Sequence, residues 1–354
     1  MLTMHADHLR KISTSIFVAA GVNEEKAGQV SQIIVDNCLY GHDSHGMACV
    51  PRFVEDVETG KIHPDAKPTV VRNGPGAAIV DGHRGFGQLT MEHSMQLAIQ
   101  IASQQAIGAV AVMNCNHIGM LWSYAKTAAE NGMVSFIWCV CGPDGGGGVM
   151  APYGGAKTAI GANPIAVGIP AGQCPPFVLD IATSVVSSGK VLWHGQQNKP
   201  IPEGWIIDQH GKPTTDPMEL FGQGIRKIAG ALLPMGGHKG FALGLASEII
   251  GGVLTRYGTG NQSAFREGNG SMIITINVES FIPLSLFVDQ VDQLLRYIKA
   301  IPTDQNTDEI FIPGELELRT YADREKNGIP VTEGLWGQLQ EVAKKYSVGI
   351  GMSG

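Results

Sequence analysis

Cysteine is scarce in this chain of 354 residues, which contains six, and no two of them are spaced as CxxC. That number is too small for the disulfide framework of a secreted protein. No apolar stretch approaches the length of a membrane-spanning helix without polar interruption. The first residues, MLTMHADHLRKIS, lack the basic and then apolar pattern of a secretory signal. We therefore expect a cytoplasmic protein with no membrane partner.

Charged residues are also few, at 16% of the chain, and the formal net charge is −7 at pH 7. Because nucleic acids and anionic membranes are bound through excess positive charge, this balance indicates neither kind of partner. Hydrophobic residues make up 44% of the chain, and there are 47 glycines. This composition is typical of a globular enzyme, and the length allows two or three structural lobes.

The chain lacks the usual motifs of nucleotide-binding folds. A Rossmann fold needs G-x-G-x-x-G directly after a strand and an acidic residue about 20 positions later. The run Asp144–Gly148 follows an apolar segment, but neither a helical pattern nor a suitably placed acid comes after it. There is no P-loop either. If the protein binds NAD, it does so through another fold.

Apolar residues recur at helical spacing in the first part of the chain and alternate with strand-like segments further on. Glycine-rich turns dominate residues 142–235. This alternation predicts an α/β architecture in which helices cover a sheet. We expect two short strands within 69–82, further strands at 108–113, 134–141, 165–169, 177–179 and 272–276, and helices at 5–21, 23–41, 51–60, 88–104, 119–130, 239–254, 284–300 and 336–346.

Two histidines, a carboxylate and a hydroxyl lie together at His42–His45, between two expected helices. Histidine is the side chain best suited to exchange a proton near neutral pH, and ketone reduction needs such a donor at the oxygen. Placement in a loop also favours function. The alternative is a helix cap formed by Asp43 or Ser44 beside surface histidines. A metal site at His42 and His45 has less support, because HxxH without nearby cysteine is common by chance.

Three further segments combine polar residues with a strand end or a helix start. Asn114–Gly119 lies where a strand gives way to a helix, so His117 is either a second proton carrier or a helix cap. Asp180–Ser184 offers a carboxylate, hydroxyls and backbone N–H groups to a ribose or phosphate, unless it is a simple helix N-cap. Gly236–Gly240 opens another helix, where Lys239 is either a phosphate partner or a solvent-exposed lysine.

Six short motifs occur in the order HDSHG (42–46), NHIG (116–119), GANP (161–164), DIATS (180–184), GGHKG (236–240) and PGE (313–315). Together they resemble the type-2 malate/L-lactate dehydrogenase family, and the resemblance extends from the first helices to the NGIP turn at 327–330. Within the family, the chain looks most similar to the bacterial hydroxycarboxylate dehydrogenase B group. That group reduces 2-oxo acids, including aromatic ones, with a nicotinamide cofactor.

The resemblance implies a mixed-sheet α/β fold, unrelated to the Rossmann fold, with helical N- and C-terminal segments. It implies a helical lobe near the subunit boundary, formed by residues 1–70 and 305–354, and an α/β region for cofactor and substrate at 71–304. Family members are typically homodimers, and the cofactor implied here is NAD or NADP. The substrate would be a small 2-oxo or 2-hydroxy acid.

By the same resemblance, Ser44 and His45 form the catalytic pair, with His45 as the acid/base. His117 lies near the reacting carbon, and either histidine carries the proton. The substrate-binding residues would be Arg52 and Asn116. The residues expected to line the cofactor site are His45, Gly119, Met120, Leu121, Val178, Leu179, Asp180, Ile181, Ala182, Gly236, His238, Lys239, Pro313, Gly314 and Glu315.

One position departs from the family pattern. Many members carry arginine four residues after the histidine of the SHG motif, where it can hold the substrate carboxylate with two hydrogen bonds. This chain has Cys49 there, and a neutral thiol cannot bind a carboxylate in that way. The hydroxycarboxylate dehydrogenase group also lacks this arginine. We therefore expect no strict preference for malate or other dicarboxylates, with Arg52 as a substitute cation.

We thus expect a reversible reduction in which hydride reaches the 2-oxo carbon and His45, oriented by Ser44, delivers the proton to the carbonyl oxygen. Three alternatives are open at this point. The first is another reductase of the family, acting on cyclic imino acids or on ureidoglycolate. The second is a metal-dependent hydrolase or lyase built on His42, His45 and His117. The third is a binding protein that keeps the fold without catalysis.

Overall fold

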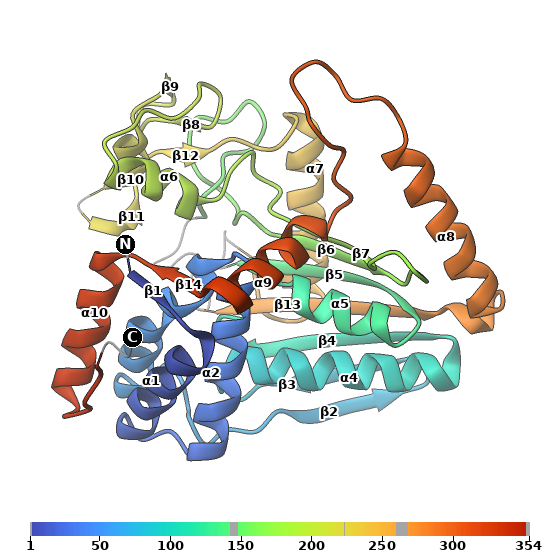
Figure 1. Cartoon of the computed structure of the whole chain (residues 1–354), viewed down its shortest axis with the longest axis horizontal. Coiled ribbons are helices and arrows are strands. Elements are labelled where there is room, and N and C mark those ends of the chain that lie inside the picture. The colour runs from blue at the N-terminus through green and yellow to red at the C-terminus, as the bar shows by residue number, and fades with distance from the viewer. Residues whose placement is uncertain (1, 142–147, 223, 260–267, 352–354) are drawn as a thin grey trace.

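The computed structural model describes residues 2–141, 148–222, 224–259 and 268–351, and it has a mixed α/β fold. Its centre is a seven-stranded sheet with the strand order β2-β3-β4-β13-β5-β6-β7 (Figure 1). In this sheet β3 and β4 run parallel, and the other neighbouring pairs are antiparallel. The strands are β2 (Thr69–Gly74), β3 (Ala77–Asp81), β4 (Ile107–Cys115), β5 (Met133–Cys141), β6 (Ile165–Ile169), β7 (Phe177–Ile181) and β13 (Asn269–Asn277).

This sheet confirms the expected mixed-sheet fold and the expected strands. Strand β13, from late in the chain, lies between β4 and β5 and pairs antiparallel with both. A Rossmann sheet is built from parallel strands, so the missing glycine fingerprint and the observed topology agree. The glycine-rich loop expected at Asp144–Gly148 lies outside the described residues except for Gly148.

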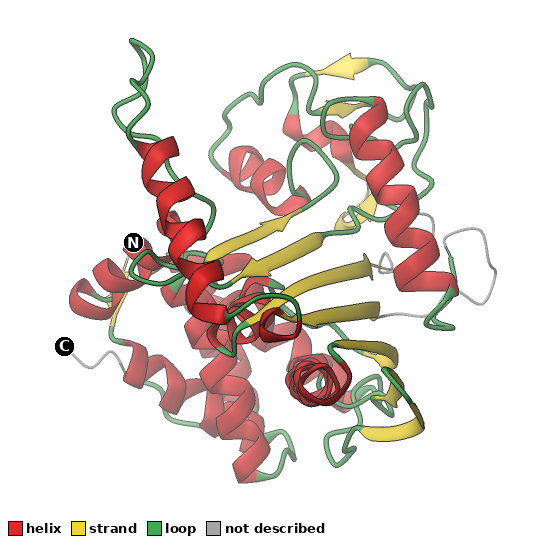
Figure 2. Ribbon diagram, turned by 90° about the vertical axis from the view of Figure 1, so that its right-hand side faces the viewer, coloured by secondary structure: helices red, strands yellow, loops and turns green. Residues whose placement is uncertain are grey.

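Helices lie on both sides of the sheet, as the two views show (Figures 1 and 2). Residues of opposite parity on β13 point to opposite faces. On one face, the Thr275 hydroxyl donates to the carbonyl of Ala98 in α4 (Gly87–Gln105), at 2.8 Å. On the other face, a Cβ at Gly270 would lie 2.3 Å from the carbonyl oxygen of Gly251. Glycine at this position therefore allows the backbone that follows α7 to pack directly on the sheet.

The helix expected at 239–254 is confirmed, but its last part is wider than an α-helix. α7 (His238–Ser247) is α-helical, and Glu248–Val253 continues it as a wider π-helical turn. Two glycines lie in this turn, and a Cβ at Gly251 would come within 3.1 Å of the backbone nitrogen of Val140 on β5. The glycines thus let the helix widen where it meets the sheet.

The two ends of the chain form a helical lobe beside the sheet (Figure 1). Strand β1 pairs antiparallel with β14, which ties the ends together. The apolar faces of the helices share one core, in which Leu9, Ile16, Phe53 and Leu339 are almost fully buried. The expected helices are confirmed by α1 (Ala6–Ala19), α2 (Glu24–Leu39), α3 (Val50–Glu58) and α10 (Glu333–Lys345). The strands β1 (Leu2–Met4) and β14 (Ile329–Val331) were not expected.

A smaller apolar cluster lies under the loops between β7 and α7. It joins α6 to a three-stranded sheet of order β12-β8-β9. The small strands were not expected, because strands of two residues show no periodic pattern. The elements of this region are α6 (Ser188–Gln196), β8 (Ile206–Ile207), β9 (Pro213–Thr214), β10 (Phe221–Gly222), β11 (Gly224–Ile228) and β12 (Ala231–Leu232).

Short 3-10 helices also occur in the described residues. They are η1 (Asp43–His45), η2 (Met47–Cys49), η3 (Pro217–Leu220) and η5 (Val278–Ser280).

Three more helices complete the fold. α5 (Trp122–Glu130) packs on β5 and β6, and α8 (Leu284–Lys299) projects at the edge of the molecule (Figure 1). α9 (Glu315–Asn327) was not expected, because its sequence is too polar to show helical periodicity and none of its residues is fully buried. No helix in the described part of the chain has the length and apolar character needed to cross a membrane.

Candidate active site

The Ser44–His45 pair lies in the short loop that joins α2 to α3. The Ser44 hydroxyl and Nδ1 of His45 are 3.1 Å apart, which is hydrogen-bond distance. The carbonyl of His45 accepts a hydrogen bond of 2.9 Å from the side-chain amide of Asn37, a buried residue of α2. A Cβ at Gly46 would lie 2.1 Å from the sulfur of Cys38. Because only glycine fits there, the loop can fold tightly back onto α2.

His117 lies against this pair. It follows β4, at a point where α4 comes so close that a Cβ at Gly87 would be 2.4 Å from the carbonyl oxygen of His117. The rings of His45 and His117 stack, with 5.5 Å between their centroids and 18° between their planes. Phe53 of α3 also packs against His117, at 5.9 Å between centroids. The structure therefore brings Ser44, His45 and His117 together.

Both imidazoles are neutral near physiological pH. Burial, with a smaller contribution from His42, lowers the pKa of His45 to about 4. Burial also lowers the pKa of His117 well below its usual value, with smaller contributions from His45 and Arg52. Nδ1 of His117 is buried and has no hydrogen-bond partner among the described residues. Neutral imidazoles accept protons, so this site suits the deprotonation of a hydroxyl group.

Cys49, at the position of the family arginine, is a buried packing residue. Its thiol donates a hydrogen bond of 3.3 Å to the carbonyl of Ser44, and burial raises its pKa to about 12. Arg52 lies one helical turn further along α3, with Nε 3.5 Å from a carboxylate oxygen of Asp56. Its positive charge contributes to the low pKa of His117. The structure thus places a cation, Arg52, within electrostatic reach of the histidine pair.

Asn116, expected to bind substrate, also has a role within the fold. Its side-chain nitrogen lies 3.2, 2.7 and 3.0 Å from the backbone carbonyl oxygens of Lys61, Arg84 and Gly85, respectively. An amide NH₂ group has two hydrogens, so these carbonyls leave no donor for a ligand. The substrate-binding role of Asn116 stays a prediction, in which its side-chain oxygen would contact the substrate. Through these hydrogen bonds, Asn116 holds the loop before α4 against the end of β4.

Strand β7 connects several of the expected cofactor segments. The N–H of Val178 donates to the carbonyl of Pro313 at 3.1 Å, which sets residues 313–315 against the strand. Gly314 has a φ of 101°, and a Cβ there would lie 3.4 Å from the nitrogen of Val178. The carboxylate of Glu315 is held by Nζ of Lys299 at 2.6 Å. The turn at Gly314 is thus fixed from both sides.

At the other end of β7, one carboxylate oxygen of Asp180 accepts hydrogen bonds from the backbone N–H groups of Leu121 and Trp122, at 2.8 and 2.9 Å. Asp180 therefore caps the first turn of α5. The interpretation as an N-cap of the helix that follows in sequence was wrong, because α6 begins only at Ser188. Met120 and Leu121 are themselves buried, and Leu179, Ile181 and Ala182 are half-buried along the strand and its extension.

The extension of β7 leads to the start of α7. The carbonyl of Thr183 accepts from the N–H of Met235 at 2.9 Å, and a Cβ at Gly240 would lie 2.6 Å from that oxygen. Gly236 has a φ of 58° and begins the turn that opens α7. His238 and Lys239 are exposed at this helix start. The expected cofactor segments near 120, 180, 236 and 314 therefore follow one line along β7.

The residues on this line fit a nicotinamide dinucleotide. Gly119, Gly236 and Gly314 all have positive φ, which allows close approach of a ligand to the backbone, and Lys239 supplies a charge for phosphate. Gln88 is fully buried, and neither of its amide atoms has a hydrogen-bond partner in the described residues. Its Cγ lies 3.9 Å from the Cβ position of Gly119. A polar ligand at Gly119 would satisfy such an amide.

Sequence patterns missed two elements that reach the catalytic pair. α6 begins beside it, since a Cβ at Gly189 would lie 3.6 Å from Cβ of Ser44. α9 contacts the loop 42–45 through Glu317 and Arg324. These residues are far from the loop in sequence, and neither lies in a recognisable motif. Only the fold brings them together.

His42 does not form a metal site with the other two histidines. Its Nε2 lies 3.6 Å from a carboxylate oxygen of Glu317, while the rings of His45 and His117 stack on each other. Within the described ranges, no group of three or more His, Cys, Asp or Glu side chains is arranged to hold a metal ion.

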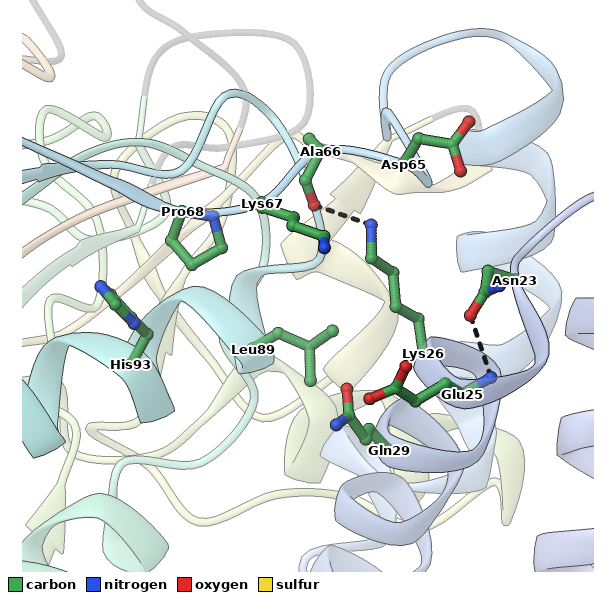
Figure 3. Close-up of a pocket in the computed structure, with 10 residues that line it drawn as sticks. All are labelled: Asn23, Glu25, Lys26, Gln29, Asp65, Ala66, Lys67, Pro68, Leu89 and His93. Atoms are coloured by element: carbon green, nitrogen blue, oxygen red, sulfur yellow. Dashed lines mark hydrogen bonds between the residues drawn. The ribbon is translucent and has the colours of Figure 1, made fainter.

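A separate cavity of about 490 Å³ lies between α2, α4 and residues 65–68 (Figure 3). Nζ of Lys26 donates to the carbonyls of Pro64 and Ala66, at 2.8 and 3.0 Å. Burial lowers the pKa of Lys26, and nearby Asp65 opposes this effect. The cavity contains none of the expected site residues. Through these two hydrogen bonds, Lys26 holds the loop against α2.

The chain is similar over nearly its whole length to known dehydrogenases. The family model for malate/L-lactate dehydrogenase matches residues 4–340. Malate dehydrogenase of Pyrococcus horikoshii is 35% identical, over 97% of this chain and 95% of its own. Hydroxycarboxylate dehydrogenase B of Escherichia coli is 33% identical, over 97% and 94%. The solved structure of the Pyrococcus horikoshii malate dehydrogenase matches with a TM-score of 0.85 at 32% identity, covering 98% of this chain and 96% of that one. The chain therefore belongs to the malate/L-lactate dehydrogenase family and is an oxidoreductase of 2-hydroxy acids.

Proposed function

We propose that this protein catalyses the reversible, NAD(P)-dependent reduction of a 2-oxo acid to a 2-hydroxy acid. One observation carries the proposal: Ser44 bonds Nδ1 of His45, whose ring stacks on His117. A proton carrier oriented by a hydroxyl beside a second imidazole is what carbonyl reduction requires. The proposal covers both NAD and NADP as cofactors.

The proton is handled by the chain's own groups. When bound, the nicotinamide supplies the hydride in one direction and accepts it in the other. With Nδ1 of His45 engaged by Ser44, Nε2 is the ring atom left for the substrate oxygen. In oxidation, neutral His45 takes the hydroxyl proton, and in reduction protonated His45 gives it to the carbonyl oxygen. A substrate carboxylate nearby raises the pKa of His45 and so favours the protonated form.

Arg52 is the proposed partner of the substrate carboxylate. The positive charge of Arg52 contributes to the low pKa of His117. A guanidinium group can hold a carboxylate through two parallel hydrogen bonds. At the position of the family arginine, Cys49 has a neutral thiol that is engaged with the carbonyl of Ser44. The site therefore suits one carboxylate better than two. We expect 2-oxo monocarboxylates to be preferred over oxaloacetate.

The proposed working unit is a homodimer that buries the outer faces of α7 and α8. These faces expose many large apolar side chains, and such surfaces are typical of contacts between identical subunits. The proposed subunit contact therefore lies at α7 and α8. The large apolar side chains exposed there are Leu243, Leu245, Ile249, Val253 and Leu254 on one segment and Phe281, Ile282, Leu286, Leu294, Tyr297 and Ile301 on the other.

A substrate panel tests the proposed reaction. The purified protein is mixed with NADH or NADPH and with pyruvate, oxaloacetate, phenylpyruvate, hydroxyphenylpyruvate or a cyclic imino acid, and absorbance of the reduced nicotinamide is followed. We expect turnover on the monocarboxylic 2-oxo acids. Preference for oxaloacetate would contradict the argument from Cys49 and Arg52. Turnover of the cyclic imino acid alone, or of no compound with either cofactor, would contradict the proposed reaction.

A further inference from the structure

Helix α9 holds the catalytic loop from outside through an arginine. Arg324 donates from Nη1 and Nη2 to the two carboxylate oxygens of Asp43, at 2.6 and 3.0 Å, and Nη1 also donates to the carbonyl of Cys38. The Arg324 side chain is 14% exposed. A paired guanidinium–carboxylate contact fixes the orientation of both groups. Asp43 directly precedes Ser44, so the contact acts one residue from the catalytic pair.

Two more residues of α9 touch the same loop. Oε1 of Glu317 lies 3.6 Å from Nε2 of His42, which lowers the pKa of Glu317. A Cβ at Gly41 would lie 3.2 Å from the methyl group of Thr320. Positions 317, 320 and 324 follow the spacing of one helix face. One face of α9 therefore covers the loop from Gly41 to Asp43.

The loop has little structure of its own. η1 consists of Asp43–His45, and its backbone bonds are those from His45 N–H to the carbonyl of His42 and from Gly46 N–H to the carbonyl of Asp43, at 2.9 and 3.1 Å. A single 3-10 turn is marginal without outside contacts. His45, whose side chain must be oriented, is the last residue of this turn. Its orientation therefore depends on the contacts that hold the turn, which are those of Asn37 with its own carbonyl and of Arg324 with Asp43.

We propose that Arg324, with Glu317, is a positioning residue that sets the orientation of the Ser44–His45 pair through Asp43 and His42. This inference rests on the proposed function of the pair. It assigns no contact with substrate or cofactor to α9. The physical basis is preorganisation, because displacing a catalytic group by about 1 Å can cost about 100-fold in rate.

Substitution of Arg324 has a matched control on the same helix. Arg319 also forms a paired contact, with Glu309, through Nη1 at 2.8 Å and Nη2 at 2.5 Å, but it does not touch the catalytic loop. Arg324→Gln should lower kcat by about 10- to 100-fold and change the KM of the nicotinamide about twofold or less. Arg324→Lys should recover part of the loss, and Arg319→Gln should behave as wild type. Equal kcat values for Arg324→Gln and wild type would overturn the proposal.

A histidine titration separates positioning from simple stabilisation and needs no turnover. The pKa of His45 is measured by NMR in protein labelled at histidine, with His45→Gln to assign the signal. In Arg324→Gln the loosened loop should expose His45 to water, so its pKa should rise toward 6.5. His42 and His117, which act on His45, are unchanged in this variant. Because Arg324→Gln leaves the Asp43 carboxylate without its cation, the double variant Arg324→Gln/Asp43→Asn, which removes both charges, should show the same rise.

The two readouts together have defined outcomes. A raised pKa of His45 with a lower kcat supports positioning. An unshifted pKa overturns the inference, whether or not the wild type turns over any 2-oxo acid. If the wild type turns over none of the substrates but the pKa of His45 still shifts in the variant, the proposed function is contradicted. The positioning contact remains supported in that case. If Arg324→Gln does not fold, both measurements are made on Asp43→Asn. This variant removes the same charge pair from the side of the loop.

Discussion

The carboxylate of Asp180 on β7 caps the first turn of α5 at Trp122, which lies 58 positions earlier in the chain. The same oxygen also accepts the N–H of Leu121, at 2.8 Å. Burial raises the pKa of Asp180, and nearby His42 opposes the rise. Because α5 follows the loop that carries His117, this contact fixes His117 relative to the strand along which the cofactor segments lie.

Asp180→Ala should therefore affect stability and catalysis together. Loss of the cap should lower the free energy of unfolding by about 1–2 kcal/mol, and the shifted His117 loop should lower kcat at least tenfold. Asp180→Asn keeps an oxygen acceptor and should cost less. Asp208, which accepts two backbone N–H groups in an exposed turn, is the control, since Asp208→Ala should leave kcat unchanged. Urea unfolding and steady-state kinetics measure both effects. A wild-type kcat in folded Asp180→Ala would contradict this account.

Burial of His45 predicts how stability changes with pH. Its pKa is about 4 in the folded protein and 6.5 in the unfolded chain, so the unfolded chain takes up the proton first as pH falls. The free energy of unfolding should decrease as pH falls from about 6.5 to about 4, by at most on the order of 3 kcal/mol from this residue. His45→Gln should show a flatter decrease in urea titrations over this range. Parallel curves for variant and wild type would show that His45 is not held neutral by burial.

Much of the central sheet could be predicted from the sequence. The segments 107–115 and 133–141 are apolar runs with turn residues at their ends, and the helices between them repeat apolar residues at helical spacing. Such local patterns determine an element whatever the rest of the chain does. Ser44, His45 and His117 could be proposed as site residues for a similar reason, because each lies in a short motif next to a helix or strand end.

Contacts between distant segments could not be predicted in the same way. Nothing in the sequence around Asn116 shows that its amide will meet three backbone carbonyls, nor that Asp180 will cap α5. α9 is rich in charged residues, so only the folded structure reveals that Arg324 holds Asp43, 281 positions away. The helix at 239–254 was expected, but its π-helical end, where Gly251 lies close to Val140 of the sheet, was not.

Arg52→Gln should weaken substrate binding more than it slows turnover. Removing the proposed carboxylate partner should raise the KM for a 2-oxo acid by about 10- to 100-fold, while the KM for the nicotinamide changes little. Arg52→Lys keeps the charge but not the paired geometry and should be intermediate. Arg72→Gln, at an exposed position on β2, is the control. If Arg52→Gln has a wild-type KM for every accepted 2-oxo acid, another cation binds the carboxylate.

A charge placed on the outer faces of α7 or α8 should split the proposed dimer. Ile249 and Tyr297 are 54% and 67% exposed in the single chain. Ile249→Asp and Tyr297→Asp should each shift the mass measured by light scattering from twice the chain mass toward one chain. Val18→Asp, at a 42% exposed position of the helical lobe, should leave the dimer intact. Dissociation by Val18→Asp alone would move the subunit contact to the helical lobe.

The most direct test of the central claim compares His45→Gln with His117→Gln in steady-state kinetics on an accepted 2-oxo acid. If His45 carries the proton, His45→Gln should lower kcat by about 100- to 10,000-fold, with the KM of the nicotinamide nearly unchanged. His117→Gln should lower kcat by a smaller factor, about tenfold. A kcat near wild type in His45→Gln, or a larger loss of kcat in His117→Gln, would contradict the assignment of His45 as the acid/base.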